Sequence, residues 1–246
     1  MYRITVLIVL SCVAARTASA QDQDPPASIP SIGSLFTQLP GDAKHLATVR
    51  NLEVIAAGAA TALLFKPYEV HVNAFIQKSD DAEYTFDAGD AIGGGFQQVG
   101  GAFATYFLGR ALSNAHLAIV GSELVRAQLI NGVLTQGLKV AADRRRPDEG
   151  AYSFPSGHAS ASFATATVIQ HEYGWKAGIP AYALASYVGV SRLSENQHYA
   201  SDVAFGAAIG IVSARAVTFG HGSTRVHVTP IASPHARGVE LEVTRN

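Results

Sequence analysis

The chain has 246 residues, of which 48% are hydrophobic and 15% charged, and its formal net charge is −1. This length suits one good-sized domain or two small ones. A nucleic-acid-binding protein usually carries a strong basic excess, so the near-neutral balance argues against that class of protein.

The first twenty residues have the pattern of a secretory signal peptide. Arg3 supplies the positive start, an apolar run follows, and Ala18-Ser19-Ala20 forms a cleavage site before Gln21. A transmembrane anchor is disfavoured, because the apolar run is too short for a span. We therefore predict that residues 1–20 direct an exported, periplasmic protein. One alternative stays open, since Val9-Leu10-Ser11-Cys12 loosely resembles a lipoprotein cleavage box.

A tether-like segment follows, and then the pattern becomes helical. Residues 21–44 are rich in Pro, Asp, Ser and Gln, which predicts a flexible tether. Residues 45–220 hold apolar runs rich in small side chains, which suit helices that pack closely against each other. We predict a helical domain over this range. Its apolar runs are residues 52–65, 96–112, 116–139, 159–171, 177–191 and 201–219.

The apolar runs are short for membrane spans. A span needs about 20 mostly apolar residues. Only twelve uncharged residues lie between Arg126 and Lys139, and again between Asp202 and Arg215. We therefore expect helices buried in a compact bundle, in a protein that is soluble or that contacts a membrane peripherally.

The end of the chain changes to a strand pattern. Residues 225–231 and 239–243 alternate apolar and polar side chains, with Pro234 and Gly238 between them, which predicts a β-hairpin. Since an isolated hairpin is marginally stable, we expect the tail, residues 221–246, to pack on the helices. The predicted fold class is all-α, a helical bundle with a short C-terminal hairpin.

Three clusters of polar residues could carry chemistry, and the first is Lys139 with the run Arg144-Arg145-Arg146 before Pro147. A run of arginines is usually a solvated surface. Several cations beside a turn can also clamp an oxyanion or a phosphate. Both interpretations stay open for this cluster when it is taken alone.

The second cluster, Pro155-Ser156-Gly157-His158, precedes a predicted helix. Ser156 would cap this helix by accepting a hydrogen bond from a first-turn amide. The free N–H groups of a helix start also bind anions, and Gly157 lets the backbone approach a ligand closely. His158 would then lie beside the bound anion. A simple cap and a catalytic site are the two interpretations of this motif.

The third cluster contains His198 and Asp202, four residues apart, which share one face if the segment is helical. They could be an exposed polar pair, part of a zinc site, or a nucleophile with the carboxylate that orients it. A zinc site lacks an evident third and fourth ligand. Arg192 adds a planar donor that suits phosphate. Together the clusters supply the cations, histidines and carboxylate that metal-free phosphoryl transfer needs.

In order and spacing the clusters read K-x6-R-P, P-S-G-H and S-R-x5-H-x3-D. This resembles the signature of the type 2 phosphatidic acid phosphatase/vanadium haloperoxidase superfamily, which includes the bacterial class A acid phosphatases. The resemblance covers about residues 112–219. It implies that His198 is the nucleophile and forms a phosphohistidine, that Asp202 orients it, and that His158 is the general acid. The phosphate would be held by Lys139, Arg146, Ser156, the Gly157 amide and Arg192.

The resemblance also implies the reaction and its alternatives. It implies hydrolysis of a phosphorylated small molecule or a lipid phosphate or diphosphate, with no metal or other cofactor and with vanadate as an inhibitor. The alternative is a vanadium-dependent haloperoxidase, in which His198 would ligate vanadate as the cofactor. A third hypothesis, a non-enzymatic envelope protein whose hairpin docks a partner, is disfavoured by the full set of charged motif residues.

The spacing between the first two motifs departs from the superfamily pattern. Only seven residues, 148–154, separate them, which leaves little room for an insertion that covers the substrate and suggests an open site. Arg144 and Arg145 have no role in the motifs. They face either an anionic head group or water.

Overall fold

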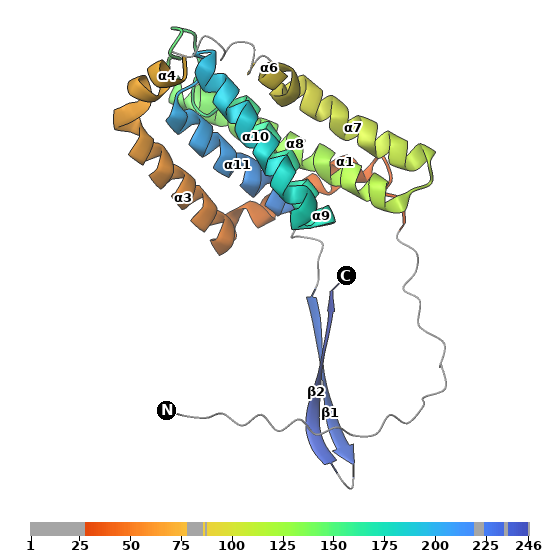
Figure 1. Cartoon of the computed structure of the whole chain (residues 1–246). Helices are drawn as coiled ribbons and strands as arrows, with labels where there is room; N and C mark the ends of the chain where they lie inside the picture. The colour runs from red at the N-terminus through yellow and green to blue at the C-terminus, as the bar shows by residue number, and fades with distance from the viewer. Residues whose placement is uncertain (1–27, 78–85, 87, 219–223, 234–235, 246) are drawn as a thin grey trace, which may run out of the picture.

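The parts of the chain that the computed structural model describes are residues 28–77, 86, 88–218, 224–233 and 236–245. The predicted signal peptide and the alternative lipoprotein motif at Cys12 lie outside the described residues, as do residues 21–27 of the predicted tether. The predicted all-α bundle is confirmed, because helices make up the body of the molecule (Figure 1).

The described helices and strands are, in chain order, α1 (Ser34–Thr37), α2 (Leu39–Lys44), η1 (His45–Ala47), α3 (Val49–Phe65), η2 (Lys66–Tyr68), α4 (Glu69–Gln77), α6 (Ala88–Gly93), α7 (Gly95–Ala111), α8 (Ala115–Ala142), α9 (Gly157–Tyr173), α10 (Trp175–Ser194), α11 (Ala200–Thr218), β1 (Thr224–Ser233) and β2 (Ala236–Arg245).

The long helix α8 lies inside the bundle and packs against α7, α9 and α11. Helix α3 packs on α11, so that α3 and α7 lie on opposite sides of the bundle in Figure 1. Side chains of α7, α8, α9 and α11 meet in the core, where Tyr106, Val125, Val168 and Val217 are fully buried. This packing holds the end of α8, the start of α9, the end of α10 and the start of α11 close together.

Small residues allow α11 to approach α9 closely. A Cβ atom on Gly206 would lie 2.6 Å from the carbonyl oxygen of Ser156, and one on Gly210 would lie 2.1 Å from that of Ser160. Real Cβ atoms do not approach backbone atoms so closely, so glycine is required at both positions. The start of α11 is thereby held against the second motif.

Two polar side chains set where α8 and α9 begin. The Asn114 side chain accepts a hydrogen bond of 3.0 Å from the N–H of Leu117 at the start of α8. Ser156 accepts one of 3.4 Å from the N–H of Ala159 at the start of α9, so the predicted cap is confirmed. Helix α8 ends at Ala142, and the next residue, Asp143, has a left-handed backbone conformation (φ 40°) that turns the chain into the arginine run.

The predicted flexible tether is wrong for residues 34–44, which form α1 and α2 and pack on the bundle. Leu35 is fully buried in the core. Asp42, 1% exposed, makes an ion pair of 2.7 Å with Arg126 of α8. The composition suggested a tether because this segment has no long apolar run. A few buried side chains hold it on the bundle instead.

Among the described residues, α8 and α11 are each long and apolar enough to cross a membrane. A bent pair of helical segments, Ser34–Ala47 and Val49–Gln77 with 68° between them, meets the same criteria when taken together. We expected apolar runs too short for a membrane span because Arg126 and Asp202 were taken to interrupt them. Both side chains are buried, and each is paired inside the bundle. The length argument is therefore wrong, because charges that are paired internally do not limit the length of a helix.

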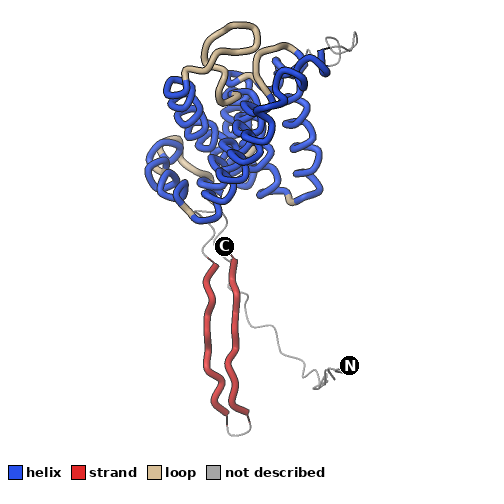
Figure 2. The backbone as a smooth tube through the Cα atoms, turned by 90° about the vertical axis from the view of Figure 1, so that its left-hand side faces the viewer, coloured by secondary structure: helices blue, strands red, loops and turns tan. Residues whose placement is uncertain are grey.

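The tail is drawn as two antiparallel strands, with Thr224 opposite Arg245 and Ser233 opposite Ala236. Figure 2 shows the two strands, in red, running side by side outside the helical body. The side chains of this tail lie outside the described residues. The expected packing of a hairpin on the helices therefore stays a prediction.

Candidate active site

The three motifs meet at one cavity of about 280 Å³, between the end of α8, the start of α9 and the loop before α11. The predicted site residues that line it are Lys139, Arg146, Gly157, His158 and His198. The other three predicted residues are buried behind this lining, with at most 2% of their surface exposed: Ser156, Arg192 and Asp202.

His198 lies in the loop between α10 and α11 and is 3% exposed. Its backbone is held at both ends: its N–H donates to the carbonyl of Arg192 at 3.2 Å, and its carbonyl accepts from Asn73 Nδ2 at 3.0 Å. The expectation that His198 and Asp202 share the face of one helix is wrong, since α11 begins only at Ala200. A turn at the helix start brings the two side chains together instead.

Asp202 lies in the first turn of α11 and is fully buried. Its Oδ2 accepts hydrogen bonds from the N–H of Tyr199 at 2.9 Å and from Ser153 Oγ at 2.5 Å. Its Oδ1 accepts from Arg144 Nη1 at 2.6 Å. His198 Nδ1 lies 3.9 Å from Oδ2 and makes no hydrogen bond with the part of the chain that the structure describes.

The cations of the first motif lie at the cavity wall and are oriented by neighbouring polar groups. Lys139, in the last turn of α8, donates from Nζ to the carbonyl of Tyr152 at 2.6 Å. Arg146 donates from Nη1 to the side chain of Gln197, which in turn donates to Asp148 Oδ2 at 2.9 Å. Both cations are therefore fixed in place beside the two histidines.

Arg192 and His158 share one carboxylate, that of Asp90 on α6. Arg192 Nη1 lies 2.7 Å from Asp90 Oδ1, and His158 Nε2 lies 3.1 Å from the same oxygen. Arg192 Nη2 also pairs with Glu195 at 2.5 Å. Sequence reasoning missed Asp90 because it stands 102 residues before Arg192 in a glycine-rich segment without a motif.

Sequence reasoning also missed Ser153, a partner of Asp202, and Glu69 of α4, a partner of Arg144. Neither residue has a distinctive sequence pattern. Arg144 stands beside the first motif, but nothing in the arginine run distinguishes it from Arg145. Of these two arginines, Arg144 turns inward: it is half-buried and contacts Asp202, whereas Arg145 is exposed.

The two histidines have different electrostatic environments. Burial lowers the pKa of His198 well below its ordinary value, and the cations Lys139 and Arg146 lower it further. Burial also lowers the pKa of His158, as does Arg192, whereas Asp90 raises it. At neutral pH His198 is therefore a neutral imidazole, which is the form that can act as a nucleophile.

The arrangement can bind and transfer a phosphoryl group. Cations and the N-terminus of α9 surround a cavity in which a neutral imidazole and a second histidine both face the ligand space. For the zinc interpretation, the described residues contain no group of three or more His, Cys, Asp or Glu side chains that could hold a metal ion.

Known proteins share this core. Residues 118–223 match the PAP2 superfamily. Over 95 residues, 37% of this chain and 21% of the relative, the sequence is 41% identical to the lipid A 1-phosphatase of Porphyromonas gingivalis. Over 99 residues, 35% of this chain and 50% of the relative, it is 31% identical to the lipid A 4'-phosphatase of Helicobacter pylori. The chain thus matches about a fifth and a half of the length of these two curated relatives.

The fold also has a solved counterpart. LpxE of Aquifex aeolicus aligns with a TM-score of 0.50 at 21% identity, over 59% of this chain and 92% of the other. This likeness concerns the fold alone. The family match begins in α8 and includes all three motifs. It is therefore through this helical core, residues 118–223, that the chain is similar to the PAP2 superfamily.

Proposed function

We propose that the protein is a phosphatase that hydrolyses a lipid phosphate through a phosphohistidine at His198. The observation that carries the proposal is the single cavity in which a buried histidine of lowered pKa faces a second histidine between fixed cations. The names of the two curated relatives, both lipid A phosphatases, support the same reaction class. They favour a phosphatase over the haloperoxidase alternative.

In the first step, His198 Nε2 attacks phosphorus, and the bond from phosphorus to the leaving oxygen breaks. Protonated His158 gives its proton to that oxygen. Lys139, Arg146 and Arg192, together with the N–H groups at the start of α9, stabilise the charge on the phosphoryl oxygens. The charge on the phosphorylated ring is stabilised by Asp202.

In the second step, water attacks the phosphohistidine. His158, now neutral, takes a proton from that water, and the bond between Nε2 and phosphorus breaks. Inorganic phosphate leaves, and His198 is again neutral. Neither step as written requires a metal ion or another cofactor.

For the substrate, we favour the phosphorylated sugar of a lipid of the lipid A type. Beyond the two histidines, the cavity is lined by amide and hydroxyl side chains of α8, namely Gln128, Asn131 and Thr135. Such groups suit the hydroxyls of a sugar better than an acyl chain. The names of the curated relatives support the same substrate class.

We further propose that the protein is associated with a membrane. The candidate spans α8 and α11 support this, as do apolar side chains that are more than two-thirds exposed, among them Leu63, Leu64, Phe75 and Phe96. The signal-peptide pattern of residues 1–20 supports a periplasmic location of the active site. Fractionation of cells would test both the membrane association and the compartment.

A substrate panel tests the proposed function. The full chain is purified in detergent, and phosphate release in EDTA is measured with lipid A, phosphatidate, an isoprenyl diphosphate, a phosphatidylglycerol phosphate and an aryl phosphate. We expect release that vanadate inhibits, with lipid A as the preferred substrate.

Two histidine variants complete the test. His198→Asn is expected to abolish release, whereas His116→Asn, at a histidine whose side chain is 54% exposed on α8, is expected to retain it. Absence of turnover on every substrate, or unchanged turnover by His198→Asn, would overturn the proposal.

A further inference from the structure

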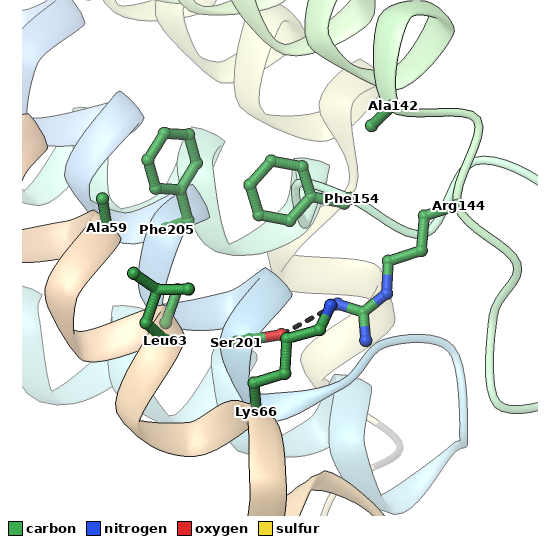
Figure 3. Close-up of a pocket in the computed structure, with 9 residues that line it drawn as sticks. Ala59, Leu63, Lys66, Ala142, Arg144, Phe154, Ser201 and Phe205 are labelled. Atoms are coloured by element: carbon green, nitrogen blue, oxygen red, sulfur yellow. Dashed lines mark hydrogen bonds between the residues drawn. The ribbon is translucent and has the colours of Figure 1, made fainter.

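The first arginine of the run 144–146 has contacts that its neighbour lacks. Figure 3 shows Arg144 reaching from the loop after α8 toward Ser201 of α11. Its Nη1 donates to Ser201 Oγ at 2.8 Å and to Asp202 Oδ1 at 2.6 Å, and its Nη2 lies 2.6 Å from Glu69 Oε2. Arg145 is exposed.

The guanidinium of Arg144 is fixed on its face as well as at its edge. Its central carbon lies 4.3 Å from the centre of the Tyr199 ring, a cation–π distance. Tyr199 is the residue between His198 and α11. The N–H of Tyr199 donates a hydrogen bond of 2.9 Å to Asp202 Oδ2. Arg144 therefore contacts both the carboxylate and the residue that follows the candidate nucleophile.

Arg144 is also the charge partner of Asp202. A fully buried carboxylate needs a nearby cation or several hydrogen bonds. His198 is neutral because its pKa is lowered, and its Nδ1 lies 3.9 Å away, so it does not serve as that cation. Lys139 acts on Asp202 only through space, since its Nζ donates to Tyr152. The ion pair with Arg144 is direct.

The contacts divide the two oxygens of Asp202 between two tasks. Oδ1 is taken by Arg144, while Oδ2 faces Nδ1 of His198. If Arg144 were absent, the carboxylate could rotate or draw a proton onto the imidazole. The side chain thus determines which oxygen is presented to His198.

Glu69 holds the other end of the same guanidinium. Its side chain is 9% exposed, and it hydrogen-bonds Ser201 as well as Arg144. Glu69 begins α4, which lies before the part of the chain that matches the PAP2 superfamily. Helices outside the matched core therefore contribute to the geometry of the site.

We propose that Arg144 is a positioning residue: anchored by Glu69, it holds the Asp202 carboxylate so that Oδ2 orients His198 for attack. This inference rests on the proposed phosphatase function. It differs from the interpretation of Arg144 as a cation for a substrate head group. It predicts an effect on kcat and on the histidine titration, with little effect on substrate binding.

The test compares Arg144→Gln and Arg144→Lys with the matched controls Arg145→Gln and Arg145→Lys, using an aryl phosphate and detergent-solubilised lipid A. We expect Arg144→Gln to lower kcat by about 10- to 100-fold, the effect of removing a group that orients a metal-binding side chain. KM and inhibition by inorganic phosphate should stay within about threefold of wild type, because Arg144 is not part of the phosphate clamp.

The pH profile separates positioning from a merely structural role. Loss of the Arg144 cation leaves the charge of Asp202 to stabilise the imidazolium of His198, so the pKa of His198 rises. The acidic limb of kcat/KM should then move to higher pH in Arg144→Gln. Arg144→Lys keeps the charge and should leave this limb near its wild-type position.

Three results would overturn the proposal: equal effects of Arg144→Gln and Arg145→Gln, an unmoved acidic limb, or a rise in KM at unchanged kcat. If Arg144→Gln does not fold, Glu69→Gln replaces it. This variant removes the anchor but keeps the Arg144–Asp202 pair, and a kcat equal to wild type would then count against the proposal. Wild-type protein without any turnover would refute the phosphatase function itself, a separate outcome.

Discussion

His198 and Asp202 face each other with 3.9 Å between Nδ1 and Oδ2, which is longer than a hydrogen bond. The carboxylate is held instead by Ser153, Tyr199 and Arg144. Phosphorylation at Nε2 would leave a cationic ring whose Nδ1–H is a strong donor. We therefore expect the pair to close as the phosphohistidine forms, so that Asp202 stabilises the transition state more than the free enzyme.

The first prediction concerns this carboxylate. Asp202→Asn should lower kcat by up to about 10⁴-fold, the effect of replacing the orienting aspartate in a Ser-His-Asp triad. Steady-state phosphate release per folded molecule is the measurement. The control is Asp42→Asn, at a buried and ion-paired aspartate outside the cavity, which should keep kcat. A kcat of Asp202→Asn within tenfold of wild type would contradict the assigned role.

The second prediction concerns Asp90 and pH. Asp90 raises the pKa of His158 against the lowering by burial and by Arg192. In Asp90→Asn the pKa of His158 should fall further. In the proposed mechanism His158 acts as an acid in its protonated form, so activity should be lost as pH rises through that pKa. The alkaline limb of kcat/KM should therefore move to lower pH.

The pH profile of kcat/KM with an aryl phosphate, taken on both sides of the ordinary histidine pKa of 6.5, is the measurement. Asp143→Asn is the control, since Asp143 is exposed and its left-handed backbone suits asparagine. A shift of the limb to higher pH, or an equal shift in the control, would be inconsistent with the contact between Asp90 and His158.

The third prediction concerns stability. Because burial lowers the pKa of His198 below 6.5, the unfolded chain binds a proton where the folded chain does not. The free energy of unfolding should therefore be fully retained above pH 6.5 and fall as pH drops below it. His198→Asn should show a weaker decline, whereas His116→Asn should follow wild type. Thermal unfolding at one pH on each side of 6.5 checks this, and equal declines in all three proteins would count against it.

The fourth prediction concerns the segment that composition assigned to a tether. Asp42→Ala leaves the buried Arg126 without its partner and should lower the free energy of unfolding by about 3–5 kcal/mol. Lys44→Ala, at an exposed residue of the same helix, should change it by less than about 0.5 kcal/mol. If the two variants were equally stable, α2 would not be part of the folded bundle.

The spacing of the three motifs pointed to the chemistry because phosphoryl transfer needs particular residue types at fixed positions. The periodicity of small and apolar residues predicted the helices for the same local reason. It failed at α1 and α2, where a few side chains, among them Leu35, Leu39 and Asp42, anchor a polar segment. It also misjudged helix length, because the charges of Arg126 and Asp202 are paired inside the bundle.

By itself, the sequence determined the helical class and the set of residues from Lys139 to Asp202 that could handle a phosphate, since both depend on local patterns and spacing. Only the tertiary structure decided that Arg144 rather than Arg145 faces Asp202, that Glu69 anchors it, and that Asp90 joins Arg192 to His158. These pairs join segments that are distant in sequence. Their formation depends on how the helices pack, which residue type and local periodicity do not record.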